Sequence, residues 1–141
     1  MQVIDSYHLS QLVENSAKPY VLVNFYTTQS ETCVKEIPGL IQLSKNPEEP
    51  VEVLFVMVED PGTFHQDPPG FWKKFLTRHR SFHLNEENAG AFVRQYLPDW
   101  QSEVPLNLLL TNTGRLVVAT GMTDPMEVRM LISKHESFYF Q

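Results

Sequence analysis

Cysteine is almost absent from this chain of 141 residues, which contains only Cys33. A single thiol excludes a disulfide within these residues, and it excludes a zinc site built from several cysteines. The single cysteine therefore does not indicate whether the protein works in an oxidising or a reducing compartment. No metal site is expected from histidine either. The i, i+4 spacing of His79 and His83 would place both side chains on one face only of a continuous helix, and a helix-to-strand transition is predicted between them.

Basic charge is also scarce, with 11 Lys and Arg against 17 Asp and Glu and a net charge of −6. Because the sequence has no basic stripe, a nucleic-acid partner is not expected. The longest apolar runs, such as residues 53–58, are far too short to span a bilayer. Residues 1–5 lack the basic and apolar regions of a signal peptide. The chain as written predicts a cytoplasmic protein, or a periplasmic one if a signal or anchor has been removed.

The remaining composition is that of a globular domain, with 42% hydrophobic and 20% charged residues. This length is enough for one core, and we expect a single domain over residues 1–135. Residues 136–141 resemble the Glu-x-x-Tyr-x-Gln pattern that a viral protease recognises in cleavable tags. They are therefore either a tag remnant or a natural aromatic tail that docks on the domain or on a partner.

Hydrophobic periodicity predicts an α/β fold. Nearly continuous apolar runs at 20–26 and 51–58 predict central strands that are covered on both faces. A turn signal at 112–114 predicts an antiparallel hairpin between strands at 106–110 and 115–119. Apolar residues at helical spacing predict five helices, at 8–15, 34–44, 71–78, 86–96 and 124–134. The segment 60–70, rich in Pro and Gly, is predicted to be a long loop. This alternation favours a right-handed βαβ unit in a central mixed sheet flanked by helices.

The segment 20–38 is the most informative part of the chain. An apolar strand ending Val23-Asn-Phe-Tyr26 is followed by a polar turn and then by Cys33-Val-Lys-Glu-Ile-Pro38. It resembles the active-site segment of thioredoxin-like proteins of the TlpA/ResA type, where V-N-F-W-A precedes W-C-x-x-C. Val104-Pro105 and Gly121-Met-Thr-Asp124 are similar to two later segments of that family. The resemblance covers roughly residues 18–133, and it implies a thioredoxin-like fold with a cis peptide bond at Pro105.

The motif departs from the family at its first cysteine, because Ser30-Glu31-Thr32-Cys33 reads SxxC instead of CxxC. In the family the first cysteine attacks a disulfide and the second resolves the mixed disulfide. A serine hydroxyl cannot form the bond to sulfur. The resemblance therefore implies a thiol-disulfide oxidoreductase relative whose dithiol activity is lost or reduced to a monothiol form. In that form Cys33 forms mixed disulfides with glutathione or a protein thiol. A serine introduced in place of a native cysteine would leave the same pattern.

Neighbouring charges bear on the state of Cys33. Carboxylates at Glu31 and Glu36 disfavour a thiolate, whereas Lys35 favours one. We expect Cys33 to be a thiol at neutral pH and partly buried, as a small hydrophobic residue would be. Asn24 stands where many thioredoxins keep a buried acid for proton transfer, and an amide has no such proton.

Two alternatives remain open for the function. The first is a binding module, in which a groove beside Ser30, Cys33 and Val104-Pro105 holds an extended peptide by main-chain hydrogen bonds. Gln29, Glu31 and Thr32 would contribute to the same groove. The second is a peroxiredoxin-like peroxidase, because the motif resembles Thr-x-x-Cys. That reading needs Arg94 or Arg115 to reach Cys33. No cofactor is expected in either case.

Overall fold

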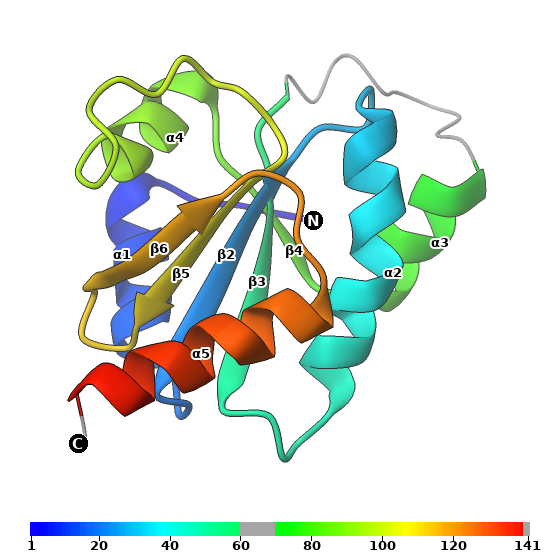
Figure 1. The fold of residues 1–141 in the computed structure, drawn as a ribbon. Coiled ribbons are helices and arrows are strands. Elements are labelled where there is room, and N and C mark those ends of the chain that lie inside the picture. Colours follow the sequence, from blue (N-terminus) through cyan, green and yellow to red (C-terminus); the bar gives the residue numbers. More distant parts are fainter. Residues whose placement is uncertain (60–69, 140–141) are drawn as a thin grey trace.

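A computed structural model describes residues 1–59 and 70–139, and it has a central six-stranded sheet (Figure 1). The strand order is β1-β4-β3-β2-β5-β6. The parallel strands are β1 (Gln2–Val3), β4 (Ser81–His83), β3 (Val51–Met57) and β2 (Tyr20–Tyr26). The antiparallel hairpin consists of β5 (Leu106–Thr111) and β6 (Leu116–Thr120). The prediction of a mixed α/β sheet is confirmed.

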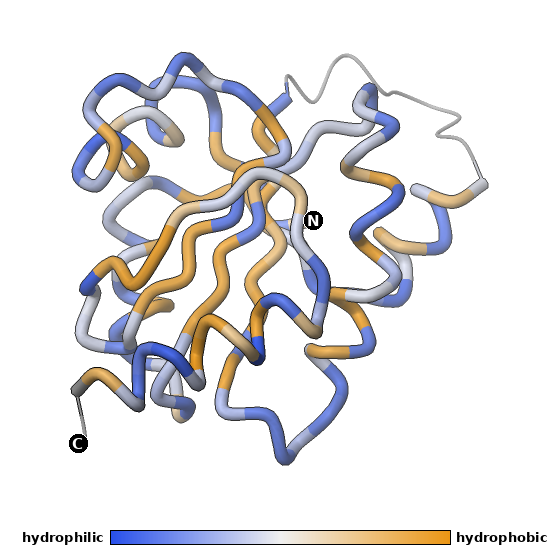
Figure 2. The backbone as a smooth tube through the Cα atoms, in the orientation of Figure 1, coloured by the Kyte–Doolittle hydropathy of each residue, from blue (hydrophilic) through white to orange (hydrophobic). Residues whose placement is uncertain are grey.

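Helices cover both faces of the sheet. On one face lie α1 (Ser6–Glu14) and α4 (Glu86–Val93), and on the other lie α2 (Glu31–Lys45), α3 (Gly70–Arg78) and α5 (Pro125–Tyr139). Every residue of β2 is buried, and Figure 2 shows hydrophobic residues gathered along the central strands. Alternate residues of β2 face opposite sides, so the sheet separates two hydrophobic cores. Cys33 belongs to the core under α2, α3 and α5.

Several element ends differ from the predicted ones. α2 begins at Glu31 instead of residue 34, because Ser30 caps it, and it continues through the exposed Pro38. α5 runs past residue 134 to Tyr139, since no Gly or Pro follows Pro125 to end it. α4 ends early, at Val93. The loop predicted at 60–70 lies, except for its last residue, outside the described residues. None of the described helices is long and apolar enough to cross a membrane.

Candidate functional site

Two predicted site segments meet at one end of the neighbouring strands β2 and β5. Strand β2 ends at Tyr26 and leads into the loop 27–30, while residues 104–105 lead into β5. The two strands are antiparallel neighbours, with Phe25 opposite Leu106. The loop after β2 and the segment before β5 therefore lie at the same end of the same strand pair. The Val104–Pro105 peptide bond is cis.

Ser30 forms the N-terminal cap of α2. Its backbone is extended, with φ −93° and ψ 117°, and its Oγ accepts a hydrogen bond of 3.2 Å from the Cys33 N–H. Its carbonyl accepts from the Val34 N–H at 3.2 Å. The first N–H groups of a helix have no partner inside the helix, and serine is among the residues that satisfy them best. In this structure the Ser30 hydroxyl is therefore an acceptor that holds the start of the helix.

The thiol of Cys33 is inaccessible, with none of its surface exposed. Burial raises the pKa of Cys33, while hydrogen bonds to Ser30 and to the backbone of Thr27 lower it. The carboxylates of Glu36 and Glu59 raise that pKa further. The raised pKa agrees with the predicted thiol form, and Glu36 is among its causes as predicted. The residue is more deeply buried than expected. Glu59 was missed because it follows β3 and is distant in sequence.

Glu36 is a buried carboxylate in the middle of a polar network. It is 3% exposed and accepts hydrogen bonds from Asn24 Nδ2, from Asn107 Nδ2 at 3.2 Å and from the Thr123 N–H at 3.0 Å. Asn24 Nδ2 also donates to Asn107 Oδ1 at 2.8 Å. Burial raises the pKa of Glu36, and these three donors oppose that rise.

The spacing of residues along α2 is a sequence signal for this network. One face of α2 points into the core and contains, at helical spacing, the four buried residues Cys33, Glu36, Ile37 and Leu40. A glutamate on such a face needs buried partners. Those partners, Asn107 and Thr123, come from β5 and from the turn before α5, so helical spacing alone could not have identified them.

A tryptophan from α3 contacts the loop after β2. Trp72 Nε1 donates to the Thr28 carbonyl at 3.1 Å, and its ring stacks on Tyr26 with 5.2 Å between ring centroids. The family motif has a tryptophan inside the loop, where this chain has the exposed Gln29. Apolar spacing over residues 71–78 predicts a helix there, but no local pattern indicates which backbone group the indole of Trp72 reaches.

The arginines required by the peroxidase alternative lie elsewhere. Arg94 is the C-terminal cap of α4, on the other face of the sheet from Cys33, and its Nε donates to the Trp100 carbonyl at 3.0 Å. Arg115 lies in the β5–β6 turn, at the end of β5 remote from Leu106. Within residues 1–59 and 70–139, no group of three or more His, Cys, Asp or Glu side chains is placed to hold a metal.

Comparisons with known proteins bear on the fold. No protein-family model and no curated protein matches the chain. Solved structures do match. A thiol:disulfide interchange protein of the thioredoxin family from Chlorobium tepidum has a TM-score of 0.64 and 14% identity, covering 89% of this chain and 83% of its own. StoA from Bacillus subtilis has a TM-score of 0.58 and 16% identity, covering 84% and 85%.

A thioredoxin of a different type agrees with these two. Thioredoxin f2 from Chlamydomonas reinhardtii has a TM-score of 0.54 and 17% identity, and the match covers 96% of both chains. The strand order, the helices on both faces and these likenesses together define a thioredoxin-like fold. At such identities the likeness concerns the fold, and the chemistry has to be argued from the residues of this chain.

Proposed function

We propose that this chain is a TlpA/ResA-related thioredoxin-fold protein that has lost the dithiol–disulfide cycle and binds an extended polypeptide instead. The binding surface comprises Ser30 with its exposed neighbours Gln29, Glu31 and Thr32, together with Val104-Pro105. The observation that carries the proposal is the pairing of a serine at the helix cap with a fully buried cysteine.

The chemistry of disulfide exchange explains why this pairing matters. Reducing a substrate disulfide completely needs two thiols, which become one new disulfide while the substrate gains two thiols. One attacking thiol alone stops at the mixed disulfide. The attacking thiol must also be ionised and accessible. Cys33 is enclosed in the core, and burial raises its pKa, so both features disfavour an attack by this thiol.

Val104 supports the binding role. Within the described ranges its backbone N–H and C=O make no hydrogen bond, although β5 begins only two residues later. One donor and one acceptor on the same residue are what an extended peptide uses when it pairs with a strand end. The exposed side chains of Gln29, Glu31 and Thr32 would lie beside such a peptide.

Thiol modification and insulin reduction test the loss of the cycle. In the folded protein we expect Cys33 to react slowly with a chromogenic disulfide reagent at neutral pH, and urea should speed the reaction. With dithiothreitol as reductant, the natural chain should reduce insulin no faster than its Cys33→Ala variant. Fast modification without denaturant, or insulin reduction that disappears in Cys33→Ala, would refute the proposal. Binding itself is tested by NMR, where an extended peptide should shift the Val104 amide signal.

A monothiol reaction is the second candidate. The hydrogen bonds that Cys33 shares with Ser30 and the backbone of Thr27 lower its pKa and so favour a thiolate. Reaction with glutathione disulfide would place one glutathione on Cys33 and release one glutathione thiol. Mass spectrometry of the folded protein after that incubation distinguishes the two candidates, because only the monothiol reaction adds the tripeptide.

A further inference from the structure

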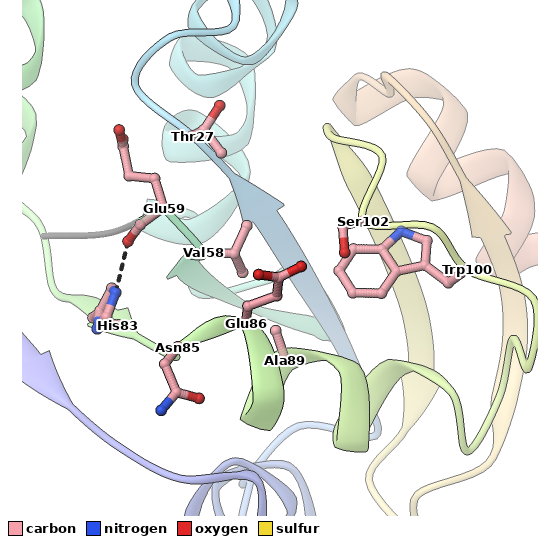
Figure 3. Close-up of a pocket in the computed structure, with 9 residues that line it drawn as sticks. All are labelled: Thr27, Val58, Glu59, His83, Asn85, Glu86, Ala89, Trp100 and Ser102. Carbon is pink, nitrogen blue, oxygen red and sulfur yellow. Dashed lines mark hydrogen bonds between the residues drawn. The ribbon is translucent and has the colours of Figure 1, made fainter. Parts of the chain in front are cut away.

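A cavity of about 360 Å³ lies at the carboxyl ends of the parallel strands, beside the start of α4 (Figure 3). Such strand ends are where α/β sheets commonly bind ligands. Its apolar lining comes from Val58 after β3, Ala89 in α4 and the ring of Trp100. The Trp100 indole N–H is already used, since it donates to the Glu103 carbonyl at 3.1 Å. These walls fit the apolar stem of a side chain or a flat group.

The polar lining is rich in hydrogen-bond acceptors. The Glu86 carboxylate lies in the middle of the lining residues in Figure 3. Glu59 lines the cavity too, but its carboxylate accepts a hydrogen bond from the Thr28 N–H. His83 lines it too and is only 4% exposed. Its Nε2–H donates to the Glu59 carbonyl at 2.7 Å, because a carbonyl can only accept. In that neutral tautomer Nδ1 carries a lone pair, and among the described residues this buried atom has no hydrogen-bond partner.

We propose that this cavity binds a guanidinium or ammonium group, carried by an arginine or lysine side chain of the polypeptide docked at Val104. Such a group brings several N–H donors, and its stem or planar face suits the apolar walls. The identity of the carrier rests on the proposed function, whereas binding of the cation does not.

An anionic ligand is the competing possibility, because the N-terminus of α4 favours negative charge. That preference is already met by Glu86 and Glu87 in the first turn, and the Asn85 side chain caps the Asn88 N–H at 2.8 Å. A second anion would also face Glu59. The guanidinium of Arg94 lies 5.8 Å from the centroid of the Trp100 ring, and Arg94 is not among the described residues that line the cavity.

The cavity also adjoins the cysteine. Thr27 lines it, and the backbone of the same residue hydrogen-bonds to Cys33. Glu59 lines it as well, and its carboxylate acts on the same thiol. A side chain held in the cavity would therefore position its polypeptide next to the loop that contains Ser30.

Binding is tested by NMR titration of the ¹⁵N-labelled chain with N-acetyl-arginine amide at low ionic strength. The indole signal of Trp100 should shift in a saturable way. That of Trp72, which belongs to α3 and packs in the core on the other face of the sheet, should not. N-acetyl-citrulline amide has nearly the same shape without the charge and should cause no shift. Glu86→Gln should weaken binding about threefold, the range expected for an exposed ion pair, while the matched Glu87→Gln should leave it unchanged.

Each contrary result overturns the inference: equal shifts with citrulline, preference for N-acetyl-glutamate amide, equal effects of the two glutamine variants, or a static Trp100 signal. A peptide library carrying arginine in one half and citrulline in the other separates this inference from the proposed function. Preference for the arginine half supports both. Equal binding of the arginine and citrulline peptides refutes the cation site and leaves the proposed peptide binding standing. Arginine-amide binding without any peptide binding refutes the docking function and leaves a site for a free small cation.

Discussion

Replacing the buried Glu36 by glutamine should change how stability depends on pH. Burial raises the pKa of Glu36 in the folded protein, while in the unfolded chain a glutamate has a pKa of about 4.3. Between these two values the folded state holds a proton that the unfolded state has released. The free energy of unfolding therefore falls as pH rises, by up to about 1.4 kcal/mol per pH unit.

Glutamine removes this ionisation and keeps most of the contacts. Its Oε1 can still accept from the Thr123 N–H, which has a bond of 3.0 Å in the natural chain. Its Nε2 would face the Asn24 Nδ2 donor, so the Asn24 amide has to turn over. Turned over, it presents Oδ1, a buried acceptor without a partner among the described residues. At acidic pH, where the carboxyl is neutral in both states, the variant should lie within about 1 kcal/mol of the natural chain. Toward neutral pH it should become the more stable of the two.

The measurement is urea unfolding of both proteins from pH 4 to pH 8, with the difference in free energy plotted against pH. Other titrating groups are common to both proteins and cancel in that difference. Glu31→Gln, at the exposed start of the same helix, controls for the loss of one negative charge. A difference that is constant with pH would refute the reasoning. One that favours the natural chain as pH rises would show that the three donors outweigh burial.

Substitutions at Trp72, Ser30 and Gly114 test single local features by urea or thermal unfolding, and two of them have a matched variant for comparison. Trp72→Phe keeps the stack on Tyr26 and loses the hydrogen bond to the Thr28 carbonyl. It should therefore destabilise the protein by about 1–2 kcal/mol. An unchanged free energy of unfolding would show that the indole does not support the loop. Ser30→Ala should lower the free energy of unfolding by about 1 kcal/mol, because α2 loses its N-terminal cap. Ser30→Thr restores a capping hydroxyl and should recover most of that loss. Gly114→Ala should lower the free energy of unfolding by about 1–2 kcal/mol, because φ is +85° there. Gly70→Ala should lower it far less, because no described atom lies within 4 Å of the added Cβ. Equal losses for the two variants would contradict this reasoning.

Much of the fold could be read from local patterns. Residues 20–26 were predicted as a strand buried on both faces, and β2 has these bounds with every residue buried. Errors concentrated at helix ends, where a cap or its absence decides the boundary. The motif indicates Ser30 as a replacement for an attacking cysteine and as part of a binding groove, but it does not indicate the capping bond from the Cys33 N–H.

The candidate site could be predicted only in part. The motif indicated Ser30, Cys33 and Val104-Pro105, but Glu59 and Trp72 were not associated with the loop. Both act through atoms that no sequence pattern identifies, a carboxylate after β3 and an indole N–H from α3. The cavity beside α4 was likewise unpredicted, because it is lined from four separate parts of the chain.

The sequence alone determined the alternation of strands and helices, the single thiol and the serine in place of a second one. These follow from side-chain chemistry and from spacing along a local backbone. Only the tertiary structure decided that Cys33 is enclosed and that Glu36 has three donors. It also decided that a cavity rich in acceptors adjoins the loop. Burial, pKa and hydrogen-bond partners depend on groups brought together from distant positions, and the chain specifies those only once it has folded.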